Sequence, residues 1–252
     1  MRAPPLALVT GGCRRLGARV AAALALAGYD LALHGTHDAA PDADLADALR
    51  RAGVEWRGFP GDFREPGVAA GILPEVTQAF GRAPDLLVNS ASLFGQDRLN
   101  DVKPRDLADA YAVNCAAAVV LTRAFVEAAG AGDRSVVNML DQRIAHPHAD
   151  QLSYTLGKAA LAAFTTVASG NAAGVRVNGV APGLTLPTAD YADEHMTWLV
   201  HQMPLRRFPG PDEVAAAILF LATNKGVNGQ VLFVDAGAGL KPFPADFMNL
   251  PR

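Results

Sequence analysis

A tyrosine and a lysine stand one helical turn apart in the stretch SYTLGK, at Tyr154 and Lys158. Residues four positions apart share one face of a helix. An ammonium group near a phenol lowers the pKa of the tyrosine, which can then donate a proton near neutral pH. The same spacing occurs on many solvated helices, so its neighbours in the chain matter. Asp141 lies 13 residues earlier, after the apolar run SVVNM, and Asn114 lies in a preceding helical stretch.

The second candidate site is the stretch TGGCRRLG at residues 10–17, directly after the apolar run LALV. Glycines in such a turn permit a sharp bend, and the helix that follows offers free N–H groups and a positive dipole end. At the first strand-to-helix junction, this pattern indicates a site for the pyrophosphate of a dinucleotide, with an ordinary turn as the alternative. Arg14 and Arg15 occupy the middle of the turn, where small residues are usual.

The end of the second expected strand bears on the choice of dinucleotide. A carboxylate there usually holds the ribose hydroxyls of NAD. Here the sequence reads LHGTHD, so His34 and Thr36 come first and Asp38 comes late. Arg14 on the facing loop would attract a 2′-phosphate. We therefore expect NADPH as the cofactor, and Asp38 keeps NADH open.

Short apolar runs alternate with alanine-rich helical stretches along the whole chain. The expected strands are Leu6–Val9, Asp30–Leu33, Glu55–Phe59, Asp85–Val88, Ser135–Asn138, Val175–Val180 and Val231–Val234. The expected helices are Leu16–Ala27, Asp42–Arg51, Gly67–Phe80, Pro104–Ala129, Tyr154–Ser169 and Asp212–Leu221. Strands buried on both faces and separated by helices predict a parallel sheet. We expect an α/β fold in which residues 1–252 form a single doubly wound Rossmann domain with seven parallel strands.

Composition narrows the classes of function. The formal net charge is −3, so no basic excess indicates nucleic acid or an anionic membrane as a partner. Two cysteines do not make a disulfide framework, which favours a reducing compartment and a cytoplasmic protein. No run of about 18 apolar residues predicts a membrane span. The start MRAPPLALVTGG suits a first strand better than a signal peptide. The histidines have no metal-like company, so we expect no metal site.

Two stretches interrupt the alternation of strands and helices. Residues 183–202 lie between a strand and a helix and contain Pro187, several acids, Tyr191 and Trp198. Insertions at the carboxyl ends of strands often form lids or binding loops, so we expect a substrate lid there. The tail GLKPFPADFMNLPR contains two aromatic residues and three prolines. It suits either packing on a neighbouring subunit or an ordered terminus.

Seven features in order resemble the short-chain dehydrogenase/reductase family over nearly the whole chain. They are TGGCRRLG, GDF at 61–63, VNSAS at 88–92, Asn114, Tyr154 with Lys158, RVNGVAPG at 176–183 and GQVLFVDAG at 229–237. Three departures from the family pattern are similar to its pteridine reductase branch. Arg15 replaces the middle glycine of the turn, Asp141 replaces the usual serine, and Phe94 follows VNSAS. NMLDQ and APGLTLP are similar to that branch as well.

The resemblance implies a role for each matching residue. Tyr154 would donate a proton, Asp141 would orient it and join a proton relay, and Lys158 would hold the nicotinamide ribose. Asn114 would hold the helix backbone and a relay water. The implied cofactor-binding residues are Gly11, Arg14, Arg15, Leu16, Gly17, His34, Asp62, Ser90, Ala91, Tyr154, Lys158, Pro182 and Gly183. The implied substrate-binding residues are Arg15, Ser92, Phe94, Asp141 and Tyr154, with Phe94 stacked on a flat ring.

The resemblance thus implies NADPH-dependent reduction of a dihydropterin or related pteridine in a homotetramer. A first alternative is an NAD(P)-dependent carbonyl, alcohol or sugar dehydrogenase of the same family, which would need serine or threonine in place of Asp141. A second alternative is a cofactor-binding protein without turnover. The presence of both Tyr154 and Lys158 speaks against it.

Overall fold

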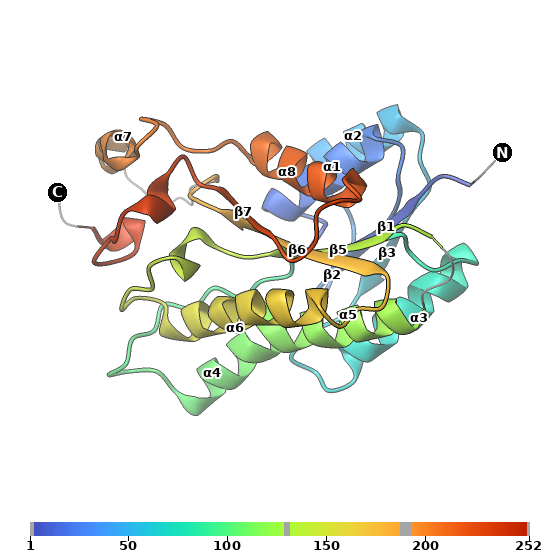
Figure 1. The fold of residues 1–252 in the computed structure, drawn as a ribbon, viewed down its shortest axis with the longest axis horizontal. Coiled ribbons are helices and arrows are strands. Elements are labelled where there is room, and N and C mark those ends of the chain that lie inside the picture. Colours follow the sequence, from blue (N-terminus) through green and yellow to red (C-terminus); the bar gives the residue numbers. More distant parts are fainter. Residues whose placement is uncertain (1–2, 129–131, 187–192, 251–252) are drawn as a thin grey trace.

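The computed structural model describes residues 3–128, 132–186 and 193–250. Its strands form one parallel sheet of seven, in the order β3-β2-β1-β4-β5-β6-β7 (Figure 1). The strands are β1 Leu6–Thr10, β2 Asp30–Gly35, β3 Trp56–Pro60, β4 Leu86–Asn89, β5 Arg134–Met139, β6 Val175–Pro182 and β7 Val231–Val234. This confirms the expected doubly wound α/β domain.

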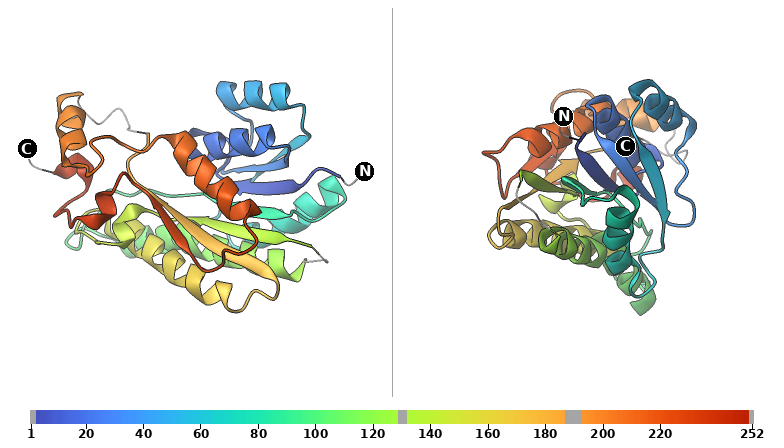
Figure 2. Two further views of the ribbon diagram at one scale, coloured as in Figure 1. Left: turned by 45° about the horizontal axis from the view of Figure 1, so that its top comes forward. Right: turned by 90° about the vertical axis from the view of Figure 1, so that its right-hand side faces the viewer.

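Helices cover both faces of the sheet (Figures 1 and 2). α1, α2 and α8 lie over one face, and α3 to α6 lie over the other. The helices are α1 Arg15–Leu26, α2 Ala43–Ala52, α3 Val68–Phe80, α4 Pro104–Tyr111, α5 Ala117–Glu127, α6 Leu152–Ser169, α7 Asp193–Gln202 and α8 Pro211–Thr223. Neighbouring strand residues therefore serve opposite cores. Leu8 packs in the core shared with α3 and α5, while Val9 packs in the core shared with α1 and α8.

The helix expected over Pro104–Ala129 is one helical run with a π-helical turn in its middle, at Ala112–Ala116 (η1). Its last expected residue, Ala129, lies outside the described residues. Asn114 sits in the π turn, as is frequent for residues at functional sites. By length and composition alone, Pro104–Glu127 would suffice to cross a membrane. Its contacts with α3 and α6 are those of a helix that covers a sheet.

Helix α6 begins two residues earlier than the sequence predicted, because a distant residue caps it. Gln151 at its N-terminus has a left-handed φ of 48° and gives the helix no side-chain hydrogen bond. Asp97 supplies the missing acceptors. Its carbonyl oxygen accepts from the Leu152 N–H at 3.1 Å, and its Oδ1 accepts from the Ser153 N–H at 3.1 Å. The loop after β4 is therefore tied to the helix that carries Tyr154.

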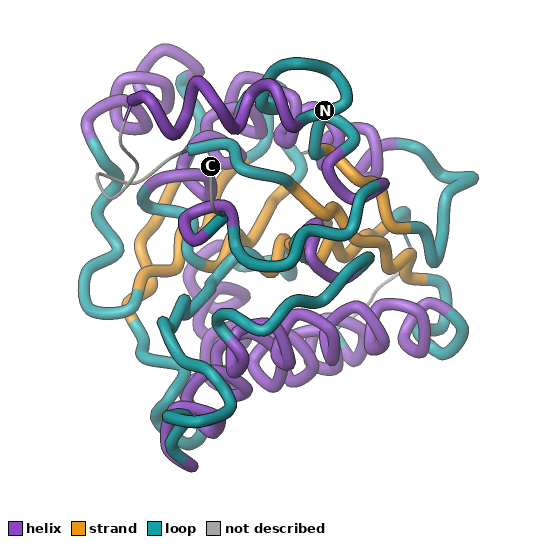
Figure 3. Tube along the Cα trace, turned by 90° about the vertical axis from the view of Figure 1, so that its left-hand side faces the viewer, coloured by secondary structure: helices purple, strands orange, loops and turns teal. Residues whose placement is uncertain are grey.

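Loops gather at the carboxyl edge of the sheet, as the view onto that end shows (Figure 3). β1 lies between β2 and β4, so the chain leaves these strands in opposite directions and opens a crevice. The expected lid contributes α7, while residues 187–192 lie outside the described part. α7 and the C-terminal segment lie together at this end (Figures 1 and 2). They share a small apolar core that includes Leu199, Met203 and Phe247.

Candidate active site

Asp141 and Tyr154 form a hydrogen-bonded pair at the carboxyl edge of the sheet. Asp141 follows β5, and Tyr154 lies in the first turn of α6. The phenol Oη donates to Asp141 Oδ2 at 2.8 Å. Burial and the neighbouring carboxylate raise the pKa of Tyr154 well above 10. The expectation that its pKa would be lowered is wrong for this structure, because the phenol is buried and its hydrogen-bond partner is a carboxylate. Tyr154 therefore holds its proton at neutral pH.

Lys158 lies one turn further along α6, with its side chain buried. Its Nζ donates to the Met139 carbonyl oxygen at 2.7 Å and lies 5.7 Å from the centre of the Tyr154 ring. Burial lowers the pKa of Lys158 to about 8. The ammonium thus lies beside the Tyr154 ring and is hydrogen-bonded to the end of β5.

Asn114 lies behind the wall of the cleft and orders the loop after β4. Its Nδ2 donates to the Leu93 carbonyl oxygen at 2.8 Å, and its Oδ1 accepts from the Leu93 N–H at 2.8 Å and the Ser92 hydroxyl at 3.1 Å. A β-carbon on Gly157 would lie 3.0 Å from Asn114 Cβ, so α6 passes close by. The Asn114 amide therefore binds the loop that carries Ser92 and Phe94. The relay water that the resemblance implies for Asn114 stays a prediction.

The glycine turn has the shape of a cradle for phosphate. Gly11 has a φ of 60°, and a β-carbon on Gly17 would lie 2.0 Å from the Gly11 carbonyl oxygen. The N-cap side chain of α1 accepts no hydrogen bond from the helix. The N–H groups in the first turn of α1 therefore have no capping acceptor, and the residues that carry them line the cleft. Thr10 Oγ1 joins the turn to the β4 loop by accepting from Ser90 N–H at 2.9 Å and Ala91 N–H at 3.0 Å.

Arg15 occupies a glycine-type backbone position, with a φ of 54°. Its Nη2 donates to the Leu186 carbonyl oxygen at 3.3 Å, so it reaches across the mouth of the cleft. Arg14 pairs with Asp38, Nη2 to Oδ2 at 3.2 Å, with both side chains more than half exposed. Both arginines line the cleft, and their guanidinium groups would meet the phosphates of a dinucleotide.

Three residues expected to bind the cofactor do not line the cleft. His34 is 1% exposed, and both of its ring nitrogens are used internally. Nδ1 accepts from the Gly11 N–H at 3.3 Å, Nε2 lies 2.8 Å from the Gly61 carbonyl oxygen, and the ring stacks on Phe63. Asp62 pairs with Arg64, which lowers the pKa of that carboxyl to about 2. The N–H of Ala91 is held by Thr10. The His34 side chain thus holds the glycine turn from inside the protein.

The cleft has a volume of about 620 Å³. Phe94 stands 44% exposed at its wall, edge-on to Tyr154, with 4.8 Å between the ring centres. The expected residues that line it are Gly11, Arg14, Arg15, Leu16, Gly17, Ser90, Ser92, Phe94, Asp141, Tyr154, Lys158, Pro182 and Gly183. The cleft thus brings a phosphate cradle, an acid and an aromatic wall into one space.

Sequence reasoning missed the residues that close the substrate side. These are Gln96, Arg143, Asp246, Phe247 and Met248, whereas Leu184 and Leu186, which also line the cleft, belong to the lid expected at 183–202. Arg143 is two residues from Asp141, and that proximity could have singled it out. The tail carried no comparable signal, because its contact with the cleft depends on long-range packing. Among residues 3–128, 132–186 and 193–250, no cluster of three His, Cys, Asp or Glu side chains suits a metal ion.

Comparisons with known proteins agree with this geometry. A family model described as Enoyl-(Acyl carrier protein) reductase matches residues 13–239. An uncharacterized oxidoreductase of Mycobacterium tuberculosis, MT0954, is 35% identical over 92% of this chain and 91% of its own. The structure of FolM alternative dihydrofolate reductase 1 from Brucella canis, complexed with NADP, is 29% identical with a TM-score of 0.86, covering 95% of this chain and 96% of the other. A 3-oxoacyl-[acyl-carrier protein] reductase from Brucella melitensis is 27% identical with a TM-score of 0.84, covering 96% and 100%.

The chain belongs to the short-chain dehydrogenase/reductase family. It is an oxidoreductase of that family, and its relatives support a nicotinamide cofactor. The residues present fit such a group, since the backbone packs too closely at Gly11 and Gly17 for any side chain, and this tight turn with the start of α1 lines the cleft. The relatives carry different substrate names, so the substrate must be argued from this chain's own cleft.

Proposed function

We propose that this protein reduces a dihydropterin or a related pteridine with NADPH. The observation that carries the proposal is the 2.8 Å hydrogen bond between Tyr154 and Asp141 in a cleft that Phe94 and Arg15 also line. Reduction of a ring C=N bond needs a hydride at carbon and a proton at nitrogen. The pair supplies a protonated phenol with a carboxylate behind it, and Phe94 offers a flat apolar surface beside it.

The bound cofactor supplies the hydride. Phe94 holds the ring with one face toward the cofactor. Because the ring is held in one orientation, less entropy is lost on reaching the transition state. Tyr154 donates its proton to the ring nitrogen next to the carbon that is reduced, and the raised pKa keeps that proton in place until then. Asp141 orients the phenol and, unlike a serine, exchanges a proton of its own. Lys158 lies within reach of the ribose side of the same space.

Two features support NADPH over NADH. The end of β2 offers the ring of His34 to the interior and no carboxylate to a ribose. The Arg14 guanidinium is exposed at the adenosine side, where a 2′-phosphate would compete with Asp38 for it. The Brucella canis neighbour was solved with NADP, in keeping with this choice.

A homotetramer and a cytoplasmic location complete the proposal. Apolar side chains stand exposed along the helices that cover one face of the sheet, among them Tyr111 on α4, Val120 on α5 and Val167 on α6. Such a surface suits burial against further copies of the chain. Cys13 and Cys115 are both free and buried, in keeping with a reducing compartment.

The second candidate is reduction of a carbonyl group, or oxidation of an alcohol or sugar. The likeness to a 3-oxoacyl-[acyl-carrier protein] reductase favours it. Tyr154 would protonate the oxygen of the carbonyl in that case. Asp141 disfavours it, because a carboxylate next to an oxyanion raises the energy of the developing negative charge.

The test is a panel of dihydropterins and simple ketones assayed with NADPH and NADH, following loss of the dihydronicotinamide absorbance. Tyr154→Phe should lower kcat for a dihydropterin about 100-fold or more. Tyr29→Phe is the matched control, since the same change is made at the amino edge of the sheet. Asp141→Ser should remove pterin reduction. Turnover of ketones but of no pterin would overturn the pteridine assignment and leave the family intact.

A further inference from the structure

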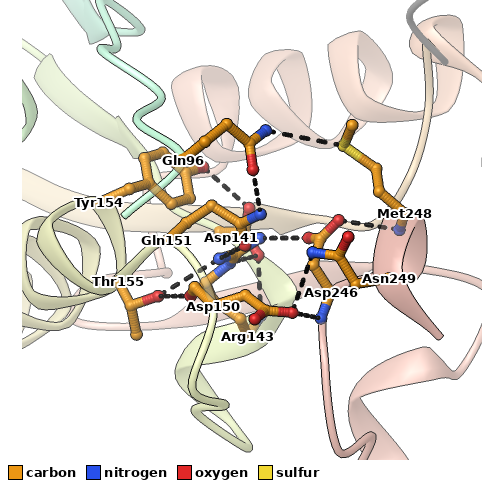
Figure 4. A network of polar contacts seen from close by, with 10 residues as sticks. All are labelled: Gln96, Asp141, Arg143, Asp150, Gln151, Tyr154, Thr155, Asp246, Met248 and Asn249. Carbon is orange, nitrogen blue, oxygen red and sulfur yellow. Dashed lines mark hydrogen bonds and ion pairs between the residues drawn. The ribbon is translucent and has the colours of Figure 1, made fainter. Parts of the chain in front are cut away.

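A buried guanidinium connects the Asp141–Tyr154 pair to the C-terminal segment. Arg143 lies in the short 3₁₀ turn after β5, and its side chain is 4% exposed. Its side-chain hydrogen bonds go to three separate parts of the chain (Figure 4). Nε donates to Asp141 Oδ1 at 3.3 Å, Nη1 to Gln151 Oε1 at 3.2 Å and Thr155 Oγ1 at 3.3 Å, and Nη2 to Asp246 Oδ2 at 2.8 Å.

Arg143 and Tyr154 bind different oxygens of the Asp141 carboxylate. Oδ1 accepts from the N–H of Arg143 at 2.9 Å and from its Nε, while Oδ2 accepts from Tyr154 Oη. With one oxygen held from the side of β5, the other points at the phenol. The guanidinium carbon also lies 4.8 Å from the centre of the Tyr154 ring, in reach of a cation–π interaction. Arg143 therefore touches both members of the pair.

The contact with Asp246 fixes the segment 246–249, which closes the substrate side. Asp246 Oδ1 accepts from the Met248 N–H at 3.0 Å, and Phe247 and Met248 line the cleft. Asp150 holds the same segment from below, accepting from the Asp246 N–H at 3.0 Å and from Asn249 Nδ2 at 3.1 Å. The position of this wall thus depends on the residue that also holds Asp141.

Charge explains why an arginine is needed here. Three carboxylates, those of Asp141, Asp150 and Asp246, lie around the buried guanidinium (Figure 4). Arg98 pairs with Asp150 from the surface, at 2.6 Å. Without Arg143, Asp141 and Asp246 would share a buried space with no cation paired to either, which is unfavourable in a low-dielectric interior. A lysine would keep the charge but could not reach three directions with a planar fork.

We propose that Arg143 is a positioning residue that sets the Asp141 carboxylate for Tyr154 and joins this pair to the segment 246–249 that contacts the substrate. The proposal rests on the proposed function only in taking Tyr154 as the proton donor. It predicts that the contacts of Arg143 with Asp141 and with Asp246 have different effects on the kinetics. The contact with Asp141 serves the chemical step, and the contact with Asp246 serves substrate binding.

The experiment compares Arg143→Gln, Arg143→Lys and Asp246→Ala on the full chain, using the hydride acceptor that the wild-type enzyme reduces best. Arg176→Gln is the matched control, because Arg176 is also a buried arginine but lies at the amino end of β6, on the carbonyl oxygens of Leu221 and Ala222. We expect Arg143→Gln to lower kcat tenfold or more. We expect Asp246→Ala to raise KM severalfold with kcat within twofold, and Arg143→Lys to recover part of the kcat.

The pH profile separates positioning from general destabilisation. Arg143 is one of the groups that lower the pKa of Lys158, while burial lowers it most and Asp141 raises it. We expect kcat of the wild type to decrease above about pH 8, where Lys158 loses its proton. This decrease should move to higher pH in Arg143→Gln and stay in place in Asp246→Ala and Arg176→Gln. Equal loss of kcat in Arg143→Gln and Asp246→Ala, with no such movement, would show that Arg143 acts only by holding the tail.

A readout without substrate keeps the proposal testable if dihydropterin reduction is absent. Hydrogen–deuterium exchange of the free protein should rise at both 141–145 and 246–249 in Arg143→Gln, and at 246–249 alone in Asp246→Ala. Unchanged exchange at 141–145 in Arg143→Gln would overturn the proposal, whatever the substrate is. If Arg143→Gln does not fold, Arg143→Lys takes its place in the same comparison. Failure of the proposed function would instead appear as wild-type protein that reduces no pterin.

Discussion

Replacing Arg15 by glycine should stabilise the fold or leave its stability unchanged while weakening the binding of cofactor or substrate. A non-glycine residue in the left-handed region costs about 1–2 kcal/mol, and Arg15 has a φ of 54°. Glycine removes that strain but adds about 0.5–1 kcal/mol of conformational entropy to the unfolded chain. The net change in the free energy of unfolding is therefore between about 0 and +1.5 kcal/mol.

The same change removes a guanidinium from the cleft. A hydrogen bond to a charged group contributes about 1.5–3 kcal/mol, which is about 10- to 150-fold in binding at 1.4 kcal/mol for each factor of ten. We expect the Kd for NADPH or the KM for the pterin to rise by this factor. Arg15 would thus be a case in which the site holds a residue that the backbone disfavours.

The assay measures urea unfolding, NADPH binding by fluorescence and steady-state kinetics on Arg15→Gly. Arg206→Gly is the matched control, because Arg206 also has a φ of 54° but is exposed outside the cleft, where it donates to the His201 carbonyl oxygen. The control should gain the same stability and keep both binding constants. An Arg15→Gly protein that is less stable than the wild type, or one that binds cofactor and substrate unchanged, would refute the reasoning.

Three further outcomes follow from the walls of the site. Gly17→Ala places a β-carbon 2.0 Å from the Gly11 carbonyl oxygen, so NADPH binding measured by fluorescence should be lost. Gly132→Ala, whose β-carbon would have no atom within 4 Å, should bind NADPH normally. Burial lowers the pKa of His34 below 6.5 in the folded chain, so the unfolded chain binds the proton more tightly. The free energy of unfolding should therefore decrease as the pH falls below 6.5. Urea unfolding of His34→Gln should show a smaller decrease in this free energy between pH 7.5 and 5. Asp38→Asn frees Arg14, so the ratio of KM for NADH to KM for NADPH should rise, and a lower ratio would contradict the role given to Arg14.

The sheet could be predicted from the sequence because each of its strands is encoded by a few consecutive residues. Each strand is a short apolar run, and such runs between helices leave few arrangements other than a parallel sheet. The pair of Tyr154 and Asp141 could be predicted for a related reason, since the carboxyl ends of β5 and the start of α6 meet at one edge. The start of α6 could not, because its cap comes from Asp97, more than 50 residues away.

His34 and the C-terminal segment are placed by contacts that no local pattern encodes. His34 stands at the end of a strand, where a cofactor contact is usual, but stacking on Phe63 and the N–H of Gly11 turn its ring inward. Asp246 is held at the cleft by Arg143 and Asp150, both of them about 100 residues or more away in the chain.

The hydroxyl of Thr10 has a consequence for the kinetics of binding. Its oxygen accepts from two N–H groups of the loop after β4 and lies 3.4 Å from the Val88 carbonyl oxygen. These contacts join the ends of β1 and β4, from which the two sides of the dinucleotide groove extend. The width of the groove is thereby set before any ligand arrives. A nucleotide should enter it in a single bimolecular step, with an observed rate that rises linearly with concentration and shows no plateau from a slow rearrangement.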